Sequence, residues 1–144
     1  MKNLKKKNKK YIIKYLSIDP IFNIYTRRYM EYLIKIKNLK YIYILDFNNI
    51  GKLNDEIGYD EVNKKFKNIF KIQKYKWFKN IYIGRLFSGD EIIIATNKNN
   101  ILNQLKELKD VSHSNGLSFE YIYFENKIEN LLEEKLKFLK KNKL

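Results

Sequence analysis

The 144-residue sequence has no cysteine, a single proline and no apolar run long enough to cross a membrane. Without cysteine the chain forms neither a disulfide framework nor a thiolate metal site, which fits a reducing compartment. A membrane helix needs about 18 to 20 apolar residues in succession. The lysine-rich start MKNLKKKNKKYIIKYLS lacks the continuous apolar segment and the small-residue cleavage site of a secretory signal. We therefore expect a cytoplasmic protein that does not enter the membrane.

Arginine is scarce although the chain is strongly basic. Only Arg27, Arg28 and Arg85 among the 30 basic residues are arginines, and the net charge is +14. Such a surplus favours attraction of a polyanion, from a nucleotide to a nucleic acid. Lysine with abundant Asn, Ile and Tyr is also what an AT-rich coding sequence produces, and arginine binds phosphates and bases better. A solvated lysine surface is therefore the favoured interpretation, and a nucleic-acid partner stays an alternative.

The spacing of apolar residues predicts one domain over residues 1–144 in which helices and strands alternate. The predicted helices cover residues 4–16 (within a basic N-terminal segment, 1–16), 26–37, 61–75, 100–109 and 128–141, with a turn or short helix over 51–58. The predicted strands cover residues 41–47, 81–87, 91–96 and 117–124. A strand, a crossover helix, a hairpin, a second helix and a returning strand form a split βαβ sheet with helices on one side. The predicted class is α+β, with a ferredoxin-like sheet that contains antiparallel strands.

Acidic residues stand at the ends of two predicted strands. Asp46 ends the apolar run YIYILDF, and Asp90 and Glu91 stand at the hairpin turn in RLFSGDEIIIA. If the first strand lies beside the hairpin, the three carboxylates converge. Such hard oxygen ligands suit Mg²⁺, which takes one or two carboxylates together with substrate phosphates, and two ions there would activate a 3′-hydroxyl and neutralise a triphosphate. The structural alternatives are a turn-capping acid at Asp46 and an ordinary turn acid at Asp90.

Three segments of the sequence are similar to three motifs that occur in the same order in one protein family. DPIFNIYTRR (19–28) is similar to the pattern DxLTxxxNRR, and LDFNNIGKLNDEIGYD (45–60) resembles LDxDxFKxxNDxxGHxxGD. SGDEI (88–92) stands where the name motif GGDEF would be. Over roughly residues 17–142 the chain resembles the GGDEF domain, the catalytic domain of diguanylate cyclases. The resemblance implies a GGDEF-like palm fold and a nucleotidyltransferase activity.

The resemblance also implies roles for individual residues. The catalytic residues would be Asp46, Asp90 and Glu91, with Glu91 preparing the attacking hydroxyl. Ligands of Mg²⁺ (or Mn²⁺) would be Asp46, the Phe47 carbonyl and Asp90, and Gly89 would let a nucleotide approach the backbone. The other implied nucleotide contacts are the phosphate-holding amides of Asn49, Ile50 and Gly51, the base reader Asn54, the second base-reading position Asn63, and the C-terminal phosphate lysine Lys140.

The sequence departs from the family pattern at several of these places. Ser88 replaces the first glycine of the name motif, and Asn48 replaces the second acid of the first-strand motif. Gly51 stands where the usual phosphate lysine would be, although Lys52 is next to it. The product-inhibition motif RxxD is absent from the corresponding stretch KNIYIGR. We therefore expect no feedback site of that kind.

Asn63 stands where the family has the aspartate that reads guanine. One carboxylate accepts from both N1–H and N2–H₂ of guanine, whereas a carboxamide offers one acceptor and one donor, which matches the edge of adenine. The alternative is that Asn63 is a solvated helix residue. In either case the carboxylate that specifies guanine is missing, and ATP is the favoured substrate.

These observations predict a metal-dependent nucleotidyltransferase that condenses NTPs, ATP favoured, into a cyclic dinucleotide or oligonucleotide second messenger. A palm of this length without a regulatory domain resembles the minimal CRISPR polymerases, which implies antiviral defence signalling. The expected partners are ATP or GTP, a second copy of the chain in a catalytic homodimer, and a downstream receptor of the product. Three alternatives stay open: a diguanylate cyclase that makes c-di-GMP from GTP, a catalytically dead nucleotide receptor, and a basic RNA-binding module.

Overall fold

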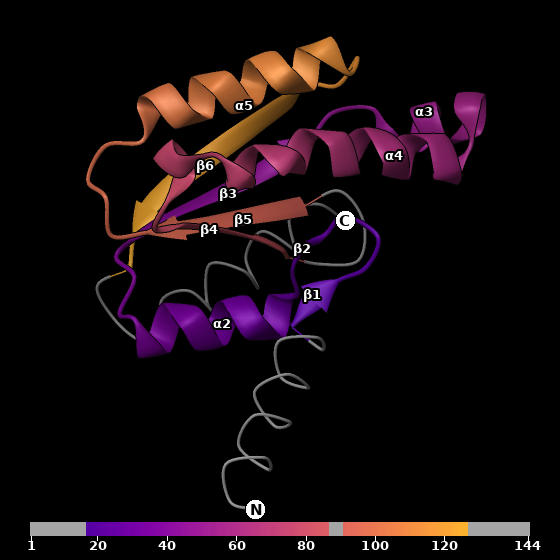
Figure 1. Cartoon of the computed structure of the whole chain (residues 1–144). Coiled ribbons are helices and arrows are strands. Elements are labelled where there is room, and N and C mark those ends of the chain that lie inside the picture. Colours follow the sequence, from indigo (N-terminus) through magenta and orange to yellow (C-terminus); the bar gives the residue numbers. More distant parts are fainter. Residues whose placement is uncertain (1–16, 87–90, 127–144) are drawn as a thin grey trace, which may run out of the picture.

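A computed structural model of the chain describes residues 17–86 and 91–126 (Figure 1). These residues form a mixed α+β fold around a six-stranded sheet with the strand order β1-β2-β4-β5-β3-β6. The strands are β1 (Ile18–Asp19), β2 (Ile24–Tyr25), β3 (Tyr41–Phe47), β4 (Ile81–Arg85), β5 (Glu91–Thr96) and β6 (Phe119–Glu125). The helices are α2 (Arg27–Ile36), α3 (Ile50–Ile57), α4 (Tyr59–Ile69) and α5 (Leu102–Ser114), with two 3₁₀ helices, η1 (Phe70–Lys74) and η2 (Lys76–Phe78). The predicted α+β sheet with flanking helices is confirmed.

The sheet is centred on β3, which is antiparallel to β5 on one side and to β6 on the other. Strand β4 is antiparallel to β5, so the β4–β5 hairpin lies beside the first long strand, as the split βαβ order predicts. The short hairpin of β1 and β2 adds to the β4 edge through one parallel pair, Tyr25 with Gly84. The sequence does not predict this hairpin, because strands of two residues show no alternation of apolar and polar positions.

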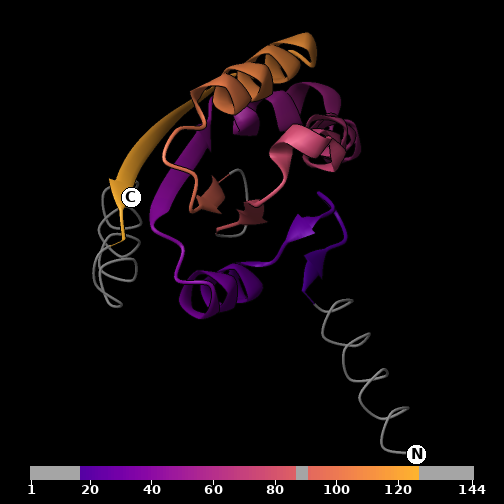
Figure 2. The same ribbon diagram turned by 60° about the vertical axis from the view of Figure 1, so that its left-hand side comes forward.

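Helices cover both faces of the sheet, which Figure 2 shows from the side. Tyr43, Leu45 and Phe47 point into a core beneath α4 and α5, whereas Ile42 and Ile44 point into a second core beneath α2. The prediction of helices on one side only is therefore wrong. A strand buried on both faces needs apolar residues at every position, which explains why the run YIYIL does not alternate.

Two predicted helices have different bounds in the structure. Helix α4 ends at Ile69, where the chain tightens into 3₁₀ turns that bury Phe70 and Ile72 before β4. The prediction of one α-helix over 61–75 is wrong over residues 70–75, since apolar spacing does not separate the two helix types over so few residues. Helix α5 continues beyond the predicted end at residue 109, and the buried Ser112 hydroxyl donates to the Leu108 carbonyl at 2.7 Å.

Within the described part of the chain, no helix is long and apolar enough to cross a membrane. The predicted short helix over 51–58 is α3, and Gly58, with φ of +88°, turns the chain from α3 into α4. The helices predicted over 4–16 and 128–141 lie outside the described residues.

Candidate functional site

Asp46 and Glu91 stand directly opposite each other on β3 and β5. The Glu91 carbonyl accepts a hydrogen bond from the Leu86 amide at 2.9 Å, so the backbone groups of Glu91 point to β4 and not to β3. Asp46 and Glu91 are therefore a non-hydrogen-bonded pair, the narrow type in which Cα atoms are about 4.5 Å apart. Both side chains are half-buried and leave the sheet on the face that α2 covers.

A third carboxylate continues this arrangement on β6, where Glu120 stands opposite Asp46. We call Glu91, Asp46 and Glu120 the acidic row; its members lie on the neighbouring strands β5, β3 and β6. Like charges opposite each other destabilise a sheet by about 0.2–1 kcal/mol per pair. The sequence prediction missed Glu120, because only the register of β6 against β3 reveals its place. Among the described residues, no three His, Cys, Asp or Glu side chains are grouped to hold a metal ion.

Phe47 fixes the end of β3 to the helical layer. Its ring is 2% exposed and meets the ring of Phe66 edge-on at 5.0 Å, and that of Phe119 at 5.1 Å. Backbone groups alternate along a strand, so Asp46 turns its carbonyl towards β6 and Phe47 turns its own towards the β5 side. The Phe47 carbonyl, a predicted metal ligand, therefore points to the side of the sheet on which β5 begins at Glu91.

The connection from β3 to α3 leaves the first N–H groups of α3 without a side-chain cap. Asn48 anchors it to Ser118, through an amide-to-carbonyl hydrogen bond of 2.9 Å and a side-chain hydrogen bond of 3.2 Å. Asn49 then adopts a left-handed conformation (φ of +57°), and no side chain caps α3. The first N–H groups of a helix have no acceptor within it, and they favour a phosphate. The amides of Ile50 and Gly51, two of the predicted phosphate contacts, belong to this turn.

The two predicted base readers lie on neighbouring helices. Asn54 is on α3, and its Oδ1 atom is buried and accepts no hydrogen bond from the described residues. Asn63 is half-buried on α4. Helices α3 and α4 pack against each other around the turn at Gly58. A buried acceptor without a partner is costly, so Asn54 is suited to receive an N–H group from a ligand.

Three predicted site residues, Gly89, Asp90 and Lys140, lie outside the described residues. The structure therefore gives no position for the second predicted metal carboxylate or for the C-terminal lysine. It does fix the two ends of the segment that holds Asp90, since Leu86 and Glu91 are joined by the hydrogen bond described above.

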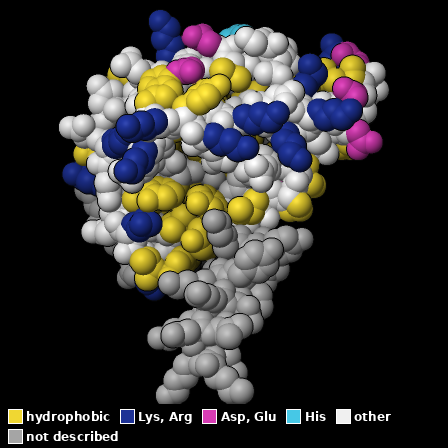
Figure 3. Space-filling model, viewed as in Figure 1, with side chains coloured by type: hydrophobic (Ala, Val, Ile, Leu, Met, Phe, Trp, Pro, Cys, Tyr) yellow, Lys and Arg dark blue, Asp and Glu magenta, His cyan; other side chains and the backbone are white. Residues whose placement is uncertain are grey.

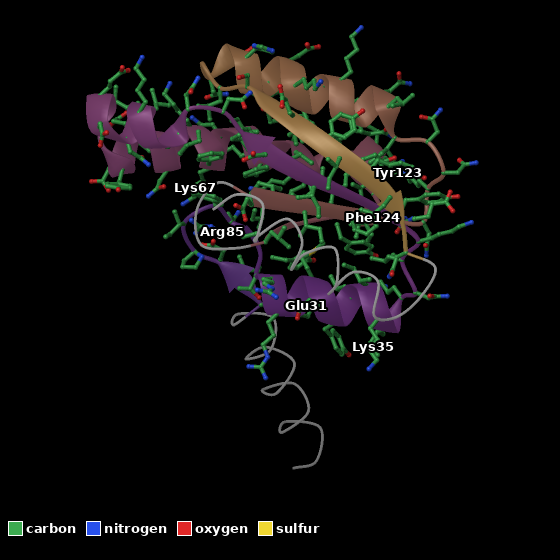
Figure 4. The ribbon with its side chains drawn as sticks, turned by 180° about the vertical axis from the view of Figure 1, so that it is seen from behind. Glu31, Lys35, Lys67, Arg85, Tyr123 and Phe124 are labelled. Carbon is green, nitrogen blue, oxygen red and sulfur yellow. The ribbon has the colours of Figure 1, made fainter. Side chains whose placement is uncertain are left out.

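An ion pair that the sequence prediction did not include holds the other strand of the same hairpin. Arg85 at the end of β4 donates from Nη1 to Oδ2 of Asp19 at 2.7 Å, and its guanidinium lies 4.1 Å from the centre of the Phe22 ring. The second oxygen of Asp19 accepts from the Ile21 amide at 2.8 Å. Figure 4 shows Arg85 at the end of the sheet opposite to Tyr123. No local pattern could reveal a pair that is 66 residues apart.

No family model and no curated protein matches the sequence. The structure is similar to diguanylate cyclase SiaD of Pseudomonas aeruginosa, solved with its activator SiaC (TM-score 0.69, 15% identity, 94% of this chain and 60% of that chain). It is also similar to a diguanylate cyclase/phosphodiesterase of Caldicellulosiruptor saccharolyticus (0.66, 16%, 84% and 82%). A third neighbour is the S helix-GGDEF-EAL part of Vibrio cholerae LapD bound to c-di-GMP (0.62, 18%, 90% and 33%). This chain thus spans 60% of the SiaD chain and 33% of the LapD chain. The chain has the fold of GGDEF domains.

Proposed function

We propose that the chain is a nucleotidyltransferase that condenses NTPs into a cyclic dinucleotide or oligonucleotide. The observation that carries this proposal is the narrow Asp46–Glu91 pair, which stands where β3 leads into the uncapped amides of α3. Carboxylates and helix N–H groups in succession are the groups that a triphosphate with its counter-ions requires. The fold of GGDEF domains supports the proposal independently of these residues.

The donor atoms at the end of β3 fit Mg²⁺ or Mn²⁺. Asp46 offers carboxylate oxygens, Phe47 a carbonyl directed to the β5 side, and the sequence adds Asp90 next to Glu91. All are hard oxygen donors, which Mg²⁺ prefers. A bound ion would supply polarisation of the phosphate and a lower pKa of the attacking hydroxyl.

The residues of the chain itself bind and orient the reactants. The amides of Asn49, Ile50 and Gly51 hold the phosphates, and Glu91 takes the proton of the ribose hydroxyl. The hydroxyl oxygen forms a bond to the α-phosphorus of a second NTP, and the bond from that phosphorus to pyrophosphate breaks. Each chain holds one NTP, so two chains must meet and a monomer is inert. The turnover per chain is therefore expected to rise with protein concentration.

Base selection is assigned to Asn54 and Asn63, and ATP is the favoured substrate. The unpartnered Asn54 Oδ1 supports an acceptor role towards an amino group of the base. With Asn63 in place of a carboxylate, the pair loses the acceptors that guanine needs. We expect Asn63→Asp to shift the ratio of ATP to GTP consumption towards GTP by roughly tenfold, since a bidentate base contact is worth about 1–3 kcal/mol.

The control for this variant is Asn68→Asp, which adds the same charge at an exposed position of α4. Competition between the two nucleotides in one reaction measures the ratio directly. An equal shift in both variants, or no shift in Asn63→Asp, would remove the assignment of base reading to Asn63.

A diguanylate cyclase is the second candidate, and the neighbours that carry this name favour it. It uses the same acidic pair and the same amides, but GTP alone as substrate. Formation of a product from GTP and from no other nucleotide would establish it.

A signalling role in antiviral defence, with a receptor for the product, is the further part of this proposal. Its support is the resemblance of the sequence to the minimal CRISPR polymerases. Loss of protection against phage in cells that carry Asp46→Asn would test it, with an exposed substitution such as Asp110→Asn as the control.

The direct test incubates the full chain with Mg²⁺ or Mn²⁺ and each NTP, singly and in mixtures, and separates the products by chromatography. A cyclic product that contains adenine is the expected result. Nucleotide binding without product in any mixture would overturn the enzyme and favour a nucleotide receptor.

A further inference from the structure

A cavity of about 360 Å³ lies between the β1–β2 hairpin, the 3₁₀ turns and the first residues of β4. Ile81 at the start of β4 is opposite Thr96 at the end of β5, whereas the acidic row begins at Glu91 at the other end of β5. Five residues of strand separate the two places, about 17 Å at 3.3–3.4 Å per residue. The cavity is therefore distinct from the site proposed for catalysis.

The cavity is formed where two strands separate. The described pairing between β2 and β4 is limited to Tyr25 with Gly84, so the two strands diverge on the N-terminal side of that pair. Asn23 and Asn80 both adopt left-handed conformations (φ of +59° and +65°) and line the cavity. The edge of a strand presents backbone N–H and C=O groups. The walls thus offer polar groups that can bond to a ligand, in addition to the side chains described next.

Aromatic rings extend from the cavity over α2. We call Tyr25, Tyr29, Tyr32 and Tyr82 the tyrosine cluster. Tyr25 and Tyr82 line the cavity, and ring centres are 4.9 Å apart between Tyr25 and Tyr29, and 5.8 Å apart between Tyr29 and Tyr32. Tyr32 is 54% exposed. Figure 3 shows hydrophobic side chains, tyrosine included, gathered between α2 and the helices on the other face.

The charged side chains that line the cavity are basic. Lys74 and Lys79 line the cavity, and none of its described lining residues is Asp or Glu. The Lys37 ammonium lies 5.6 Å from the centre of the Tyr82 ring. Burial, and then the neighbouring Tyr29 and Tyr82, raise the pKa of Tyr25 from its ordinary value, so its hydroxyl, which is neutral at neutral pH in any case, resists ionisation further. The surface therefore attracts a polyanion that also presents flat rings.

We propose that the cavity and the tyrosine cluster bind single-stranded nucleic acid. Bases stack on tyrosine rings whatever their identity, because every base has a π face, and lysines along the groove follow the phosphates. The row of rings from the cavity to Tyr32 is longer than one base, which favours a polymer over a mononucleotide. Duplex nucleic acid keeps its bases stacked on each other and cannot use these rings. Binding of a nucleic acid uses the excess of lysines in the chain, which catalysis at the acidic pair does not require.

The first experiment measures fluorescence anisotropy of a labelled 12-nucleotide oligouridylate with the full chain, without metal or NTP. Labelled UMP and a 12-base-pair RNA duplex are the comparison probes. We expect the single strand to bind at least tenfold more tightly than either. Its affinity should fall linearly in log–log form with salt, at about 0.7 per contacted phosphate. Equal binding of UMP or of the duplex would overturn the proposal.

The second experiment compares matched variants. Tyr32→Ala should weaken binding of the single strand by roughly tenfold, because one base loses its ring. Tyr59→Ala is the control, since Tyr59 is also exposed (71%) and begins α4, outside the cavity lining and the cluster. Both side chains are exposed, so circular dichroism is expected to show an unchanged fold. An equal loss in the two variants, or none in Tyr32→Ala, would reject the stacking surface.

The lysines are tested in the same way. The double variant Lys74→Gln/Lys79→Gln should weaken binding and lower the salt slope by about 1.4, because two phosphate contacts are removed. Lys64→Gln/Lys106→Gln removes the same charge from exposed positions of α4 and α5. If the two double variants lose affinity equally, the attraction is only that of a basic protein and the proposal fails. Asp46→Asn should bind the strand with unchanged affinity, which separates this test from that of catalysis.

Discussion

The two strands of the β4–β5 hairpin place a carboxylate beside a positive charge in one case and beside a negative charge in the other. At the end of β4, Arg85 meets Asp19 at 2.7 Å, and both side chains are largely buried (21% and 10% exposed). At the start of β5, Glu91 stands opposite Asp46, a residue of the same charge. An opposite charge compensates the charge of a buried carboxylate within the fold, whereas a like charge in a narrow strand pair lowers stability. We infer from this difference that the cross-strand neighbour of an acidic residue, more than its burial, indicates whether the fold uses the charge as an ion pair; the catalytic role of Asp46 and Glu91 is the one proposed above.

The variant Asp46→Asn tests this difference between the two strands most directly. We expect it to lower product formation by roughly 100- to 1000-fold, since charge stabilisation at such a site is worth several kcal/mol and about 1.4 kcal/mol corresponds to a factor of ten. The melting temperature is expected to stay the same or to rise, because the change removes a like charge opposite both Glu91 and Glu120. A chromatographic assay of NTP turnover measures the first effect, and thermal unfolding measures the second.

The matched control is Asp110→Asn at an exposed position of α5. It removes the same charge and should leave turnover unchanged. If Asp46→Asn unfolds the chain, Asp46 has the structural role that we assign to Asp19, and the contrast between the two strands disappears.

The sequence contains enough information to place Asp46 beside Glu91, but not enough to find their surroundings. Apolar runs and a hairpin signal predict which long strands pair, and these strands carry the two carboxylates. Glu120 depends on the register between β3 and β6, which no short pattern contains. The Asp19–Arg85 pair depends on a hairpin whose strands are two residues long. Contacts between segments far apart in sequence arise from packing, so they become visible only in the folded chain.

The next prediction concerns the ion pair on β4. Arg85→Ala should lower the free energy of unfolding by about 2–4 kcal/mol, because it leaves the mostly buried Asp19 without its partner. Urea unfolding of Arg85→Ala, Asp19→Ala and the double variant gives the coupling energy between the two residues. We expect the double variant to be more stable than the sum of the single effects implies. Strictly additive losses would show that the pair is not the unit that holds the hairpin.

A milder substitution tests the ring contact within that ion pair. Arg85→Lys keeps the charge but loses the planar group above Phe22. It is expected to lose less stability than Arg85→Ala and more than Lys-to-Arg exchange at an exposed position such as Lys64. Equal stability of Arg85→Lys and the unchanged chain would assign the whole effect to charge.

The smallest expected effect belongs to the exposed member of the acidic row. Glu120→Gln removes one like charge opposite Asp46 and should raise the free energy of unfolding by about 0.2–1 kcal/mol. The gain should shrink as salt is added, because the Debye length falls to about 3 Å at 1 M. Glu125→Gln on the same strand is the control, since Glu125 lies 4.0 Å from the Lys40 ammonium and opposite Tyr41. That change is expected to leave stability unchanged or slightly lower.

The turnover of Glu120→Gln then decides how far the functional region extends along the sheet. If turnover is unchanged while stability rises, the functional unit is the narrow Asp46–Glu91 pair, and Glu120 contributes only repulsion. If turnover falls by tenfold or more while the fold is retained, the whole row of three strands acts on the substrate. In that case Glu91, Asp46 and Glu120 together form the functional group of carboxylates, and the structural carboxylate of this region is Asp19, the partner of Arg85 on β4.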